Sequence, residues 1–148
     1  MADLHKNQPV PSPQPSAAVA AGVAHVQGTI FASAVRTAAT YTSDEMFNAN
    51  AKGIRLYIVR TVATGTLTVS IEGRDPVTDS WVAITGATTP ALTSAINTTL
   101  TVYPGITVAA GTGTTSTEIS NFLPCAWRVK AVVATDTTTW SIGGEYLL

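Results

Sequence analysis

Two aspartates on either side of a predicted turn are the first candidates for chemistry. Asp75 and Asp79 flank a segment that also contains Thr78 and Ser80, and oxygen ligands of this kind bind Ca²⁺, which needs six or more of them. A simpler interpretation exists, because an aspartate before a proline begins turns and a turn aspartate hydrogen-bonds to the local backbone. The sequence therefore predicts a structural turn here and no metal site.

Other residue types that catalyse reactions lack a suitable setting. Asp44 and Glu45 are neighbours in a predicted loop, and no second carboxylate pair has a spacing suited to glycoside hydrolysis. A Ser-His-Asp triad is implausible because His5 and His25 lie in the N-terminal segment or at its junction with the domain. We therefore expect no catalytic residues and no enzyme activity.

The glycine-rich segment and the cysteine also have structural interpretations. Residues 111–117 are rich in glycine and threonine, but they lack the lysine and the strand-to-helix setting of a phosphate-binding loop. Cys125 is the only cysteine, which excludes a disulfide scaffold. Its position before Trp127 in a predicted strand favours a small buried apolar residue. No cofactor and no small-molecule substrate are expected.

Three tryptophans could stack on sugars if they were exposed. Trp127 is in phase with Val129, and Trp140 is in phase with Ile142, so both are predicted to lie in the core. Trp81 begins a predicted strand directly after the turn, and its environment is ambiguous. A glycan-binding role therefore depends on Trp81.

The composition favours a protein with much of its surface covered by partners. Charged residues make up 11% of the 148 residues, against roughly 25% in an ordinary soluble domain, and about one residue in six is threonine. The net charge is −1 and no basic run is present, which argues against nucleic-acid binding. No apolar run approaches the ~18 residues of a membrane span, so no membrane partner is expected.

Residues 1–27 are predicted to form an extended arm, followed by one domain at 28–148. Prolines alternate with other residues in 9–15, which favours polyproline II and opposes a helix. The apolar segment 17–26 resembles a signal-peptide core, but prolines precede it where basic residues should lie, so we expect no signal peptide. Within it, residues 17–24 could form two helical turns with Ser16 as N-cap.

Such an arm is expected to become ordered only against a partner. Fixing the backbone costs roughly 1–2 kcal/mol per residue, and the small domain offers too little surface to cover the whole arm. Proline lowers that cost because it stiffens the free chain. The candidate partner-binding residues are Pro9, Val10, Pro11, Pro13, Pro15, Val19, Val23 and Val26.

Alternating apolar residues predict strands throughout the domain. The clearest case is the hairpin at 67–84, where Leu67, Val69 and Ile71 alternate with polar residues before a turn at 73–80. Residues 42–52 are expected to be a loop anchored by Phe47, residues 86–94 a loop plugged by Leu92, and residues 106–121 the least structured part. Strands are predicted at 30–41 (one long or bent strand), 54–62, 66–72, 81–84, 96–103, 125–133 and 140–147.

Seven or eight short strands without a convincing helix predict an all-β domain. The predicted fold class is an antiparallel β-sandwich, either jelly-roll or immunoglobulin-like, with an extended Pro/Ala-rich N-terminal arm. The strand pattern does not choose between the two topologies.

Several short motifs resemble a known family. They are Arg36-Thr37 and the segments at 51–56, 69–76, 100–106 and 123–129. Together they resemble small β-rich virion structural proteins of tailed bacteriophages, over roughly residues 30–145 and without the arm. The sequence departs from the family's pattern at Cys125, where members commonly carry arginine.

The resemblance implies a capsid cement or decoration protein on the outside of the phage head. Its expected partners are the major capsid protein and neighbouring copies of itself, as a homotrimer, and it would be made in the host bacterial cytoplasm. Two alternatives stay open: another virion component of the tail, collar or baseplate, and a glycan-binding module for host attachment.

Overall fold

The computed structural model describes residues 27–111 and 116–148. This part of the chain forms strands and no helix, which confirms the predicted all-β class, and it contains no helix that is long and apolar enough to cross a membrane. The predicted arm residues, Pro9 to Val26, lie outside the described residues. The strands are β1 (Gln27–Arg36), β2 (Ala39–Thr42), β3 (Met46–Phe47), β4 (Gly53–Ala63), β5 (Leu67–Arg74), β6 (Trp81–Thr88), β7 (Ile96–Val102), β8 (Thr117–Ile119), β9 (Ala126–Val133) and β10 (Thr138–Leu147).

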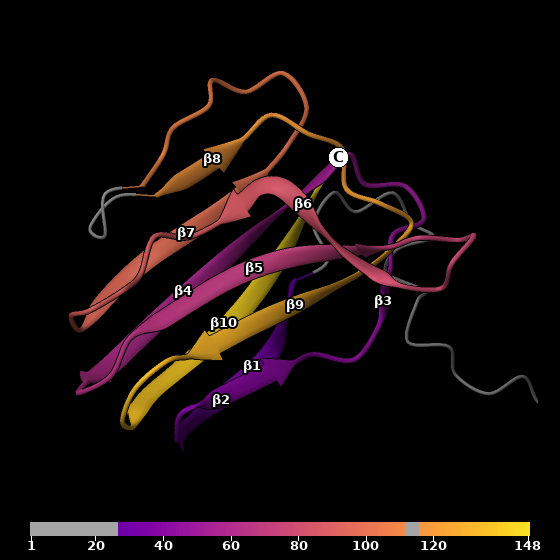
Figure 1. The fold of residues 1–148 in the computed structure, drawn as a ribbon. Helices are drawn as coiled ribbons and strands as arrows, with labels where there is room; N and C mark the ends of the chain where they lie inside the picture. Colours follow the sequence, from indigo (N-terminus) through magenta and orange to yellow (C-terminus); the bar gives the residue numbers. More distant parts are fainter. Residues whose placement is uncertain (1–26, 112–115) are drawn as a thin grey trace, which may run out of the picture.

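The strands form two facing sheets (Figure 1). Sheet A has the order β1-β10-β4-β7-β8 and sheet B the order β2-β9-β5-β6, with β3 also paired to β9. The antiparallel pairs are nested along the chain: β5 with β6, β4 with β7, β2 with β9 and β1 with β10. This nesting is the double Greek key of a jelly roll, so the structure decides between the two predicted topologies.

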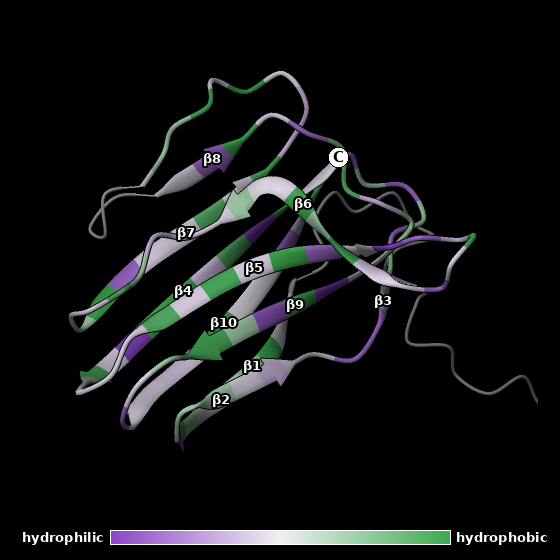
Figure 2. Ribbon diagram, in the orientation of Figure 1, coloured by the Kyte–Doolittle hydropathy of each residue, from purple (hydrophilic) through white to green (hydrophobic). Residues whose placement is uncertain are grey.

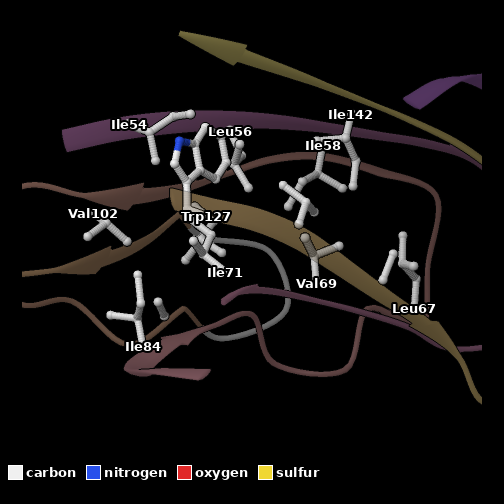
Figure 3. Packing of buried hydrophobic residues seen from close by; sticks show 14 of the residues in the cluster. Ile54, Leu56, Ile58, Leu67, Val69, Ile71, Ile84, Val102, Trp127 and Ile142 are labelled. Carbon is white, nitrogen blue, oxygen red and sulfur yellow. The ribbon is translucent and has the colours of Figure 1, made fainter. Parts of the chain in front are cut away.

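The predicted alternation places the core between the sheets. In β4, Ile54, Leu56 and Ile58 are buried, and in β5 the residues Leu67, Val69 and Ile71 face them from the other sheet. Figure 3 shows the indole of Trp127 beside Leu56 and Ile54, across the gap between the layers. The buried apolar cluster is Ile54, Leu56, Ile58, Leu67, Val69, Ile71, Ile84, Ala87, Leu92, Leu100, Val102, Leu123, Trp127, Val129, Ala131, Val133, Trp140 and Ile142.

This cluster confirms three predictions about single residues. Trp127 and Trp140 are fully buried, as their phase along the strands indicated. Leu92 is also buried, and its backbone bonds to Leu67 in both directions. It therefore plugs the end of the sandwich between β6 and β7.

The prediction of one long strand at 30–41 is wrong. β1 ends at Arg36 in sheet A, and β2 begins at Ala39 in sheet B, so the chain crosses from one layer to the other within two residues. The alanine, serine and threonine side chains of this region are small enough to suit either sheet, and for this reason the sequence does not mark the crossing.

The predicted anchor of the loop at 42–52 is also wrong. Phe47 has 72% of its surface exposed, and the neighbouring Met46 packs against the core instead. Met46 pairs with Trp127 and Phe47 with Ala126. Because successive side chains of a strand point to opposite faces, only Met46 can share the core face with Trp127.

For residues 106–125 the structure differs from two further predictions. Cys125 is exposed, because β9 begins only at Ala126 and the chain bends before it. Within the segment predicted to be least structured, β8 pairs parallel to β7 at the edge of sheet A, and Ala109 forms a bridge with Glu118 on its other side. A three-residue strand is too short to show an alternating pattern.

Candidate functional site

One end of the sandwich gathers several chain segments from distant parts of the sequence. We call it the hairpin end, because the β5–β6 turn (residues 75–80) lies there. Asn48 ties two segments together: its backbone N–H donates to Cys125 O at 2.7 Å, and its side-chain amide donates to Leu123 O at 3.2 Å. Lys52 N–H donates to Leu147 O at 2.9 Å, which places the C-terminal strand end at the same place.

The first residues of β1 lie at this end too. Gln27 pairs with Glu145 near the end of β10, and β10 continues to Leu147, which pairs with Gly53. The hydroxyl of Tyr146 joins the two sheets here, since it accepts the Trp127 Nε1–H at 3.2 Å and donates to Phe47 O at 3.2 Å. Burial raises the pKa of Tyr146. Gln27, the first described residue, therefore lies at the hairpin end.

The turn aspartates serve the turn itself. The Asp75 carboxylate accepts the Thr78 hydroxyl at 2.6 Å and the Val77 N–H at 2.9 Å, and these bonds, the hydroxyl first, lower the pKa of Asp75. Asp79 adopts a left-handed backbone conformation with φ of 60°. Its side chain pairs with Arg74, not with the local backbone as predicted. No group of three or more His, Cys, Asp or Glu side chains suited to a metal occurs among residues 27–111 and 116–148.

A network of ion pairs continues over the outer face of sheet B. Arg74 bonds to both oxygens of Glu45, at 2.8 and 2.9 Å. Glu72, although buried, is held by Arg128 at 2.7 Å and by Lys130 at 3.3 Å. The few charges of this face therefore neutralise one another.

Trp81 is half-buried at the edge of the same network. The Arg128 guanidinium lies 4.4 Å from the centre of the Trp81 ring, an arrangement that stabilises both groups by cation–π attraction. One face of the indole is thus occupied by a side chain of the protein itself, and only the remaining surface of the ring could stack on a sugar.

Five of the nine exposed large apolar side chains among the described residues lie at the hairpin end. Val77, Phe47 and Phe122 have exposed fractions of 88%, 72% and 69%, and Val82 and Leu148 are about half exposed. Figure 2 shows hydrophobic segments, in green, among the hydrophilic ones at this end of the molecule. Apolar surface gathered in this way marks interaction sites with proteins. Sequence reasoning missed this surface because the residues lie in loops or at strand ends, where no alternation exposes them.

A shallow groove of about 270 Å³ crosses this surface. Its lining includes Gly73, where an added Cβ would lie only 2.7 Å from Pro124 Cγ. The absence of a side chain at Gly73 therefore lets Pro124 pack onto β5. Asn121 lies at its rim, with Oδ1 accepting the Phe122 N–H at 2.8 Å. The groove is lined by Gly73, Arg74, Asp75, Val82, Ala83, Ile84, Asn121, Phe122 and Pro124.

Comparison with known proteins yields distant structural likenesses. No protein-family model matches the sequence, and no curated protein matches it. A chain from the structure of infectious bursal disease virus Gt strain is similar over 83% of this chain, with a TM-score of 0.45 and 10% identity. A chain from the Gx strain structure is similar over 82%, with a TM-score of 0.39 and 12% identity. This chain spans about a third of the length of each, at 33% and 30%.

Proposed function

We propose that this chain is a virion structural protein of a tailed bacteriophage, a cement or decoration protein that binds the outside of the head shell. The observation that carries the proposal is the apolar hairpin end, where Phe47, Val77 and Phe122 are each exposed and where β1 begins. A monomer gains nothing from exposing such residues, whereas a subunit of an assembly buries them.

The paired charges support the same function. Arg74 is held by Glu45, and Glu72 is held by Arg128 and Lys130. A neutral face can pack against a protein without burying an unpaired charge, which would cost several kcal/mol per ion. The motifs that resemble phage virion proteins agree with this interpretation.

In the proposed assembly the arm acts as a clamp. Residues 2–26 lie across adjacent major capsid subunits or the next copy of this protein, within a homotrimer. Each clamp stabilises the shell by mass action, as does any ligand of the native state. Many copies on one shell add avidity.

Deletion of residues 2–26 tests the clamp on purified capsids. We expect lower occupancy of the shell and lower resistance of the shell to heat. Phe122→Ser lowers occupancy in the same assay, whereas Val35→Ser, at an exposed position of β1 remote from the hairpin end, serves as the matched control. Unchanged occupancy in both the deletion and Phe122→Ser contradicts the proposal.

Copy number separates the head from the alternatives. Quantitative mass spectrometry of virions produced from the genome that encodes this chain should give hundreds of copies per particle for a cement protein. A few copies indicate a tail, collar or baseplate component. For a host-attachment module, Trp81→Ala should abolish binding to cells, while a cement protein should show no such loss.

A further inference from the structure

We propose that the proline repeat of one copy, residues 9–15, binds as a polyproline II helix in the groove of Val82, Phe122 and Pro124 on a second copy. This inference rests on the proposed function for the arm's role as a clamp, and it names the surface that the arm of a neighbour occupies. The groove and the repeat are otherwise unexplained features of the chain.

The lining of the groove matches this kind of ligand. Phe122, with 69% of its surface exposed, lines the groove together with Pro124 and Val82. Proline-rich segments dock in grooves lined by aromatic side chains, because the free segment already has the bound conformation and little entropy is lost. The sequence Pro9-Val-Pro-Ser-Pro-Gln-Pro15 presents a proline at every second position.

The hydrogen-bonding needs of the two partners are complementary. A proline has no backbone N–H, so the repeat presents mainly carbonyl acceptors. Asn121 uses Oδ1 to accept the Phe122 N–H, which leaves the side-chain amide nitrogen as a donor at the rim. In the proposed complex that nitrogen donates to a carbonyl of the repeat.

The charges at the groove do not oppose binding. Arg74 is neutralised by Glu45 and Asp79, and the Asp75 carboxylate is occupied by its own turn. Residues 7–16 contain no charged side chain. Docking of the repeat therefore brings no further charge into the groove.

The location of the arm favours a second copy as its source. β1 is an edge strand of sheet A, and β6, which lines the groove, is an edge strand of sheet B at the other side of the sandwich. Gln27, the first described residue, and the groove therefore lie on opposite sides of the hairpin end. Residues 16–26 can span roughly 36 Å when extended, which is about the width of a domain of this size.

Sedimentation velocity of the full-length chain, over a range of concentrations and without capsids, tests the proposal. We expect concentration-dependent self-association. It should weaken at least about tenfold, equivalent to ~1.4 kcal/mol, both in Phe122→Ser and in a variant with serine at positions 9, 11, 13 and 15. Asn121→Ala should weaken it as well, and Val35→Ser should not change it. Thermal unfolding of each variant establishes that the fold is retained.

A second experiment uses a peptide with the sequence of residues 7–16. Added to the wild-type chain, it should dissociate the oligomer, and it should have no effect on Phe122→Ser. A wild-type chain that stays monomeric overturns the inference, as does an oligomer that survives the four serine substitutions. Because capsids are absent, such a result leaves capsid binding to be decided by the occupancy test.

Discussion

The guanidinium carbon of Arg36 lies 3.9 Å from the centre of the Trp140 ring. Phe31 and Tyr41 also lie close to this cation, with ring centres 5.5 and 5.8 Å away. The guanidinium donates to Trp140 O at 2.8 Å and to Ala32 O at 2.9 Å. Since Arg36 ends β1 in sheet A and Tyr41 belongs to β2 in sheet B, this one side chain fastens the crossing between the two layers.

Replacing Arg36 should loosen this crossing. In Arg36→Met the aromatic rings keep an apolar neighbour, but the carbonyls of Ala32, Ala34 and Trp140 lose a charged donor and the cation–π attraction is lost. We expect the free energy of unfolding to fall by about 2–4 kcal/mol, as measured by urea denaturation. Arg55→Met, which removes one 3.3 Å bond to Thr101, should cost under about 1 kcal/mol. Equal losses in the two variants would show that the ring contacts contribute nothing.

Arg60 holds the opposite end of the sandwich. It is buried and has no carboxylate partner within 27–111 and 116–148, and it donates to Thr138 Oγ1 at 2.7 Å and to the carbonyls of Leu92 and Gly65. Burial lowers the pKa of Arg60. Arg60→Met removes these three bonds from a charged donor, although Leu92 O keeps the Leu67 N–H and Thr138 keeps its bond to Val62 O. We expect the free energy of unfolding to fall by about 3–5 kcal/mol.

A conservative variant tests whether the planar group is what matters at this position. Arg60→Lys keeps the charge, but a lysine ammonium lacks the planar fork of donors with which arginine reaches three separate acceptors. Its midpoint in urea should lie close to that of Arg60→Met. Recovery of wild-type stability by lysine would contradict this account.

Tyr146 should make the protein sensitive to alkali. Burial raises its folded-state pKa, so above the ordinary value of about 10 the unfolded chain loses this proton while the folded chain keeps it. The free energy of unfolding should therefore fall as pH rises from the ordinary pKa of tyrosine through the raised one. In Tyr146→Phe that contribution should vanish.

The same variant should lose about 1–3 kcal/mol of its free energy of unfolding at pH 7, because the buried Trp127 Nε1–H loses its acceptor. Tyr103→Phe, at the same end, is the matched control for loss of a hydroxyl.

Asp75 should make the turn sensitive to acid. Hydrogen bonds from Thr78 and the Val77 amide lower its folded-state pKa, so its contribution to stability is present above the ordinary pKa of aspartate and is lost as pH falls through the lowered one. Asp75→Asn should therefore flatten the dependence of the thermal midpoint on pH below about 4. Wild-type acid sensitivity in this variant would assign the effect to other carboxylates.

The correct predictions of buried core residues came mostly from the alternation of side chains along the strands. Ile54, Leu56 and Ile58 face the core because a strand's side chains repeat every two residues, a property that needs no knowledge of the partner strand. The same rule places Trp127 and Trp140 inside. It fails at Phe47 and Cys125, because a two-residue strand and a bend before a strand contain too few residues to fix a phase.

The sequence by itself determined that the domain is all-β, where most strands lie and which faces they bury, because these depend on local periodicity. Only the tertiary structure decided that β1 pairs with β10 and β2 with β9, and hence that the sandwich is a jelly roll. It also decided that Phe47 and Phe122 share one end with the start of β1. Pairing between residues more than a hundred positions apart depends on the summed burial of both sheets, which no stretch of sequence displays.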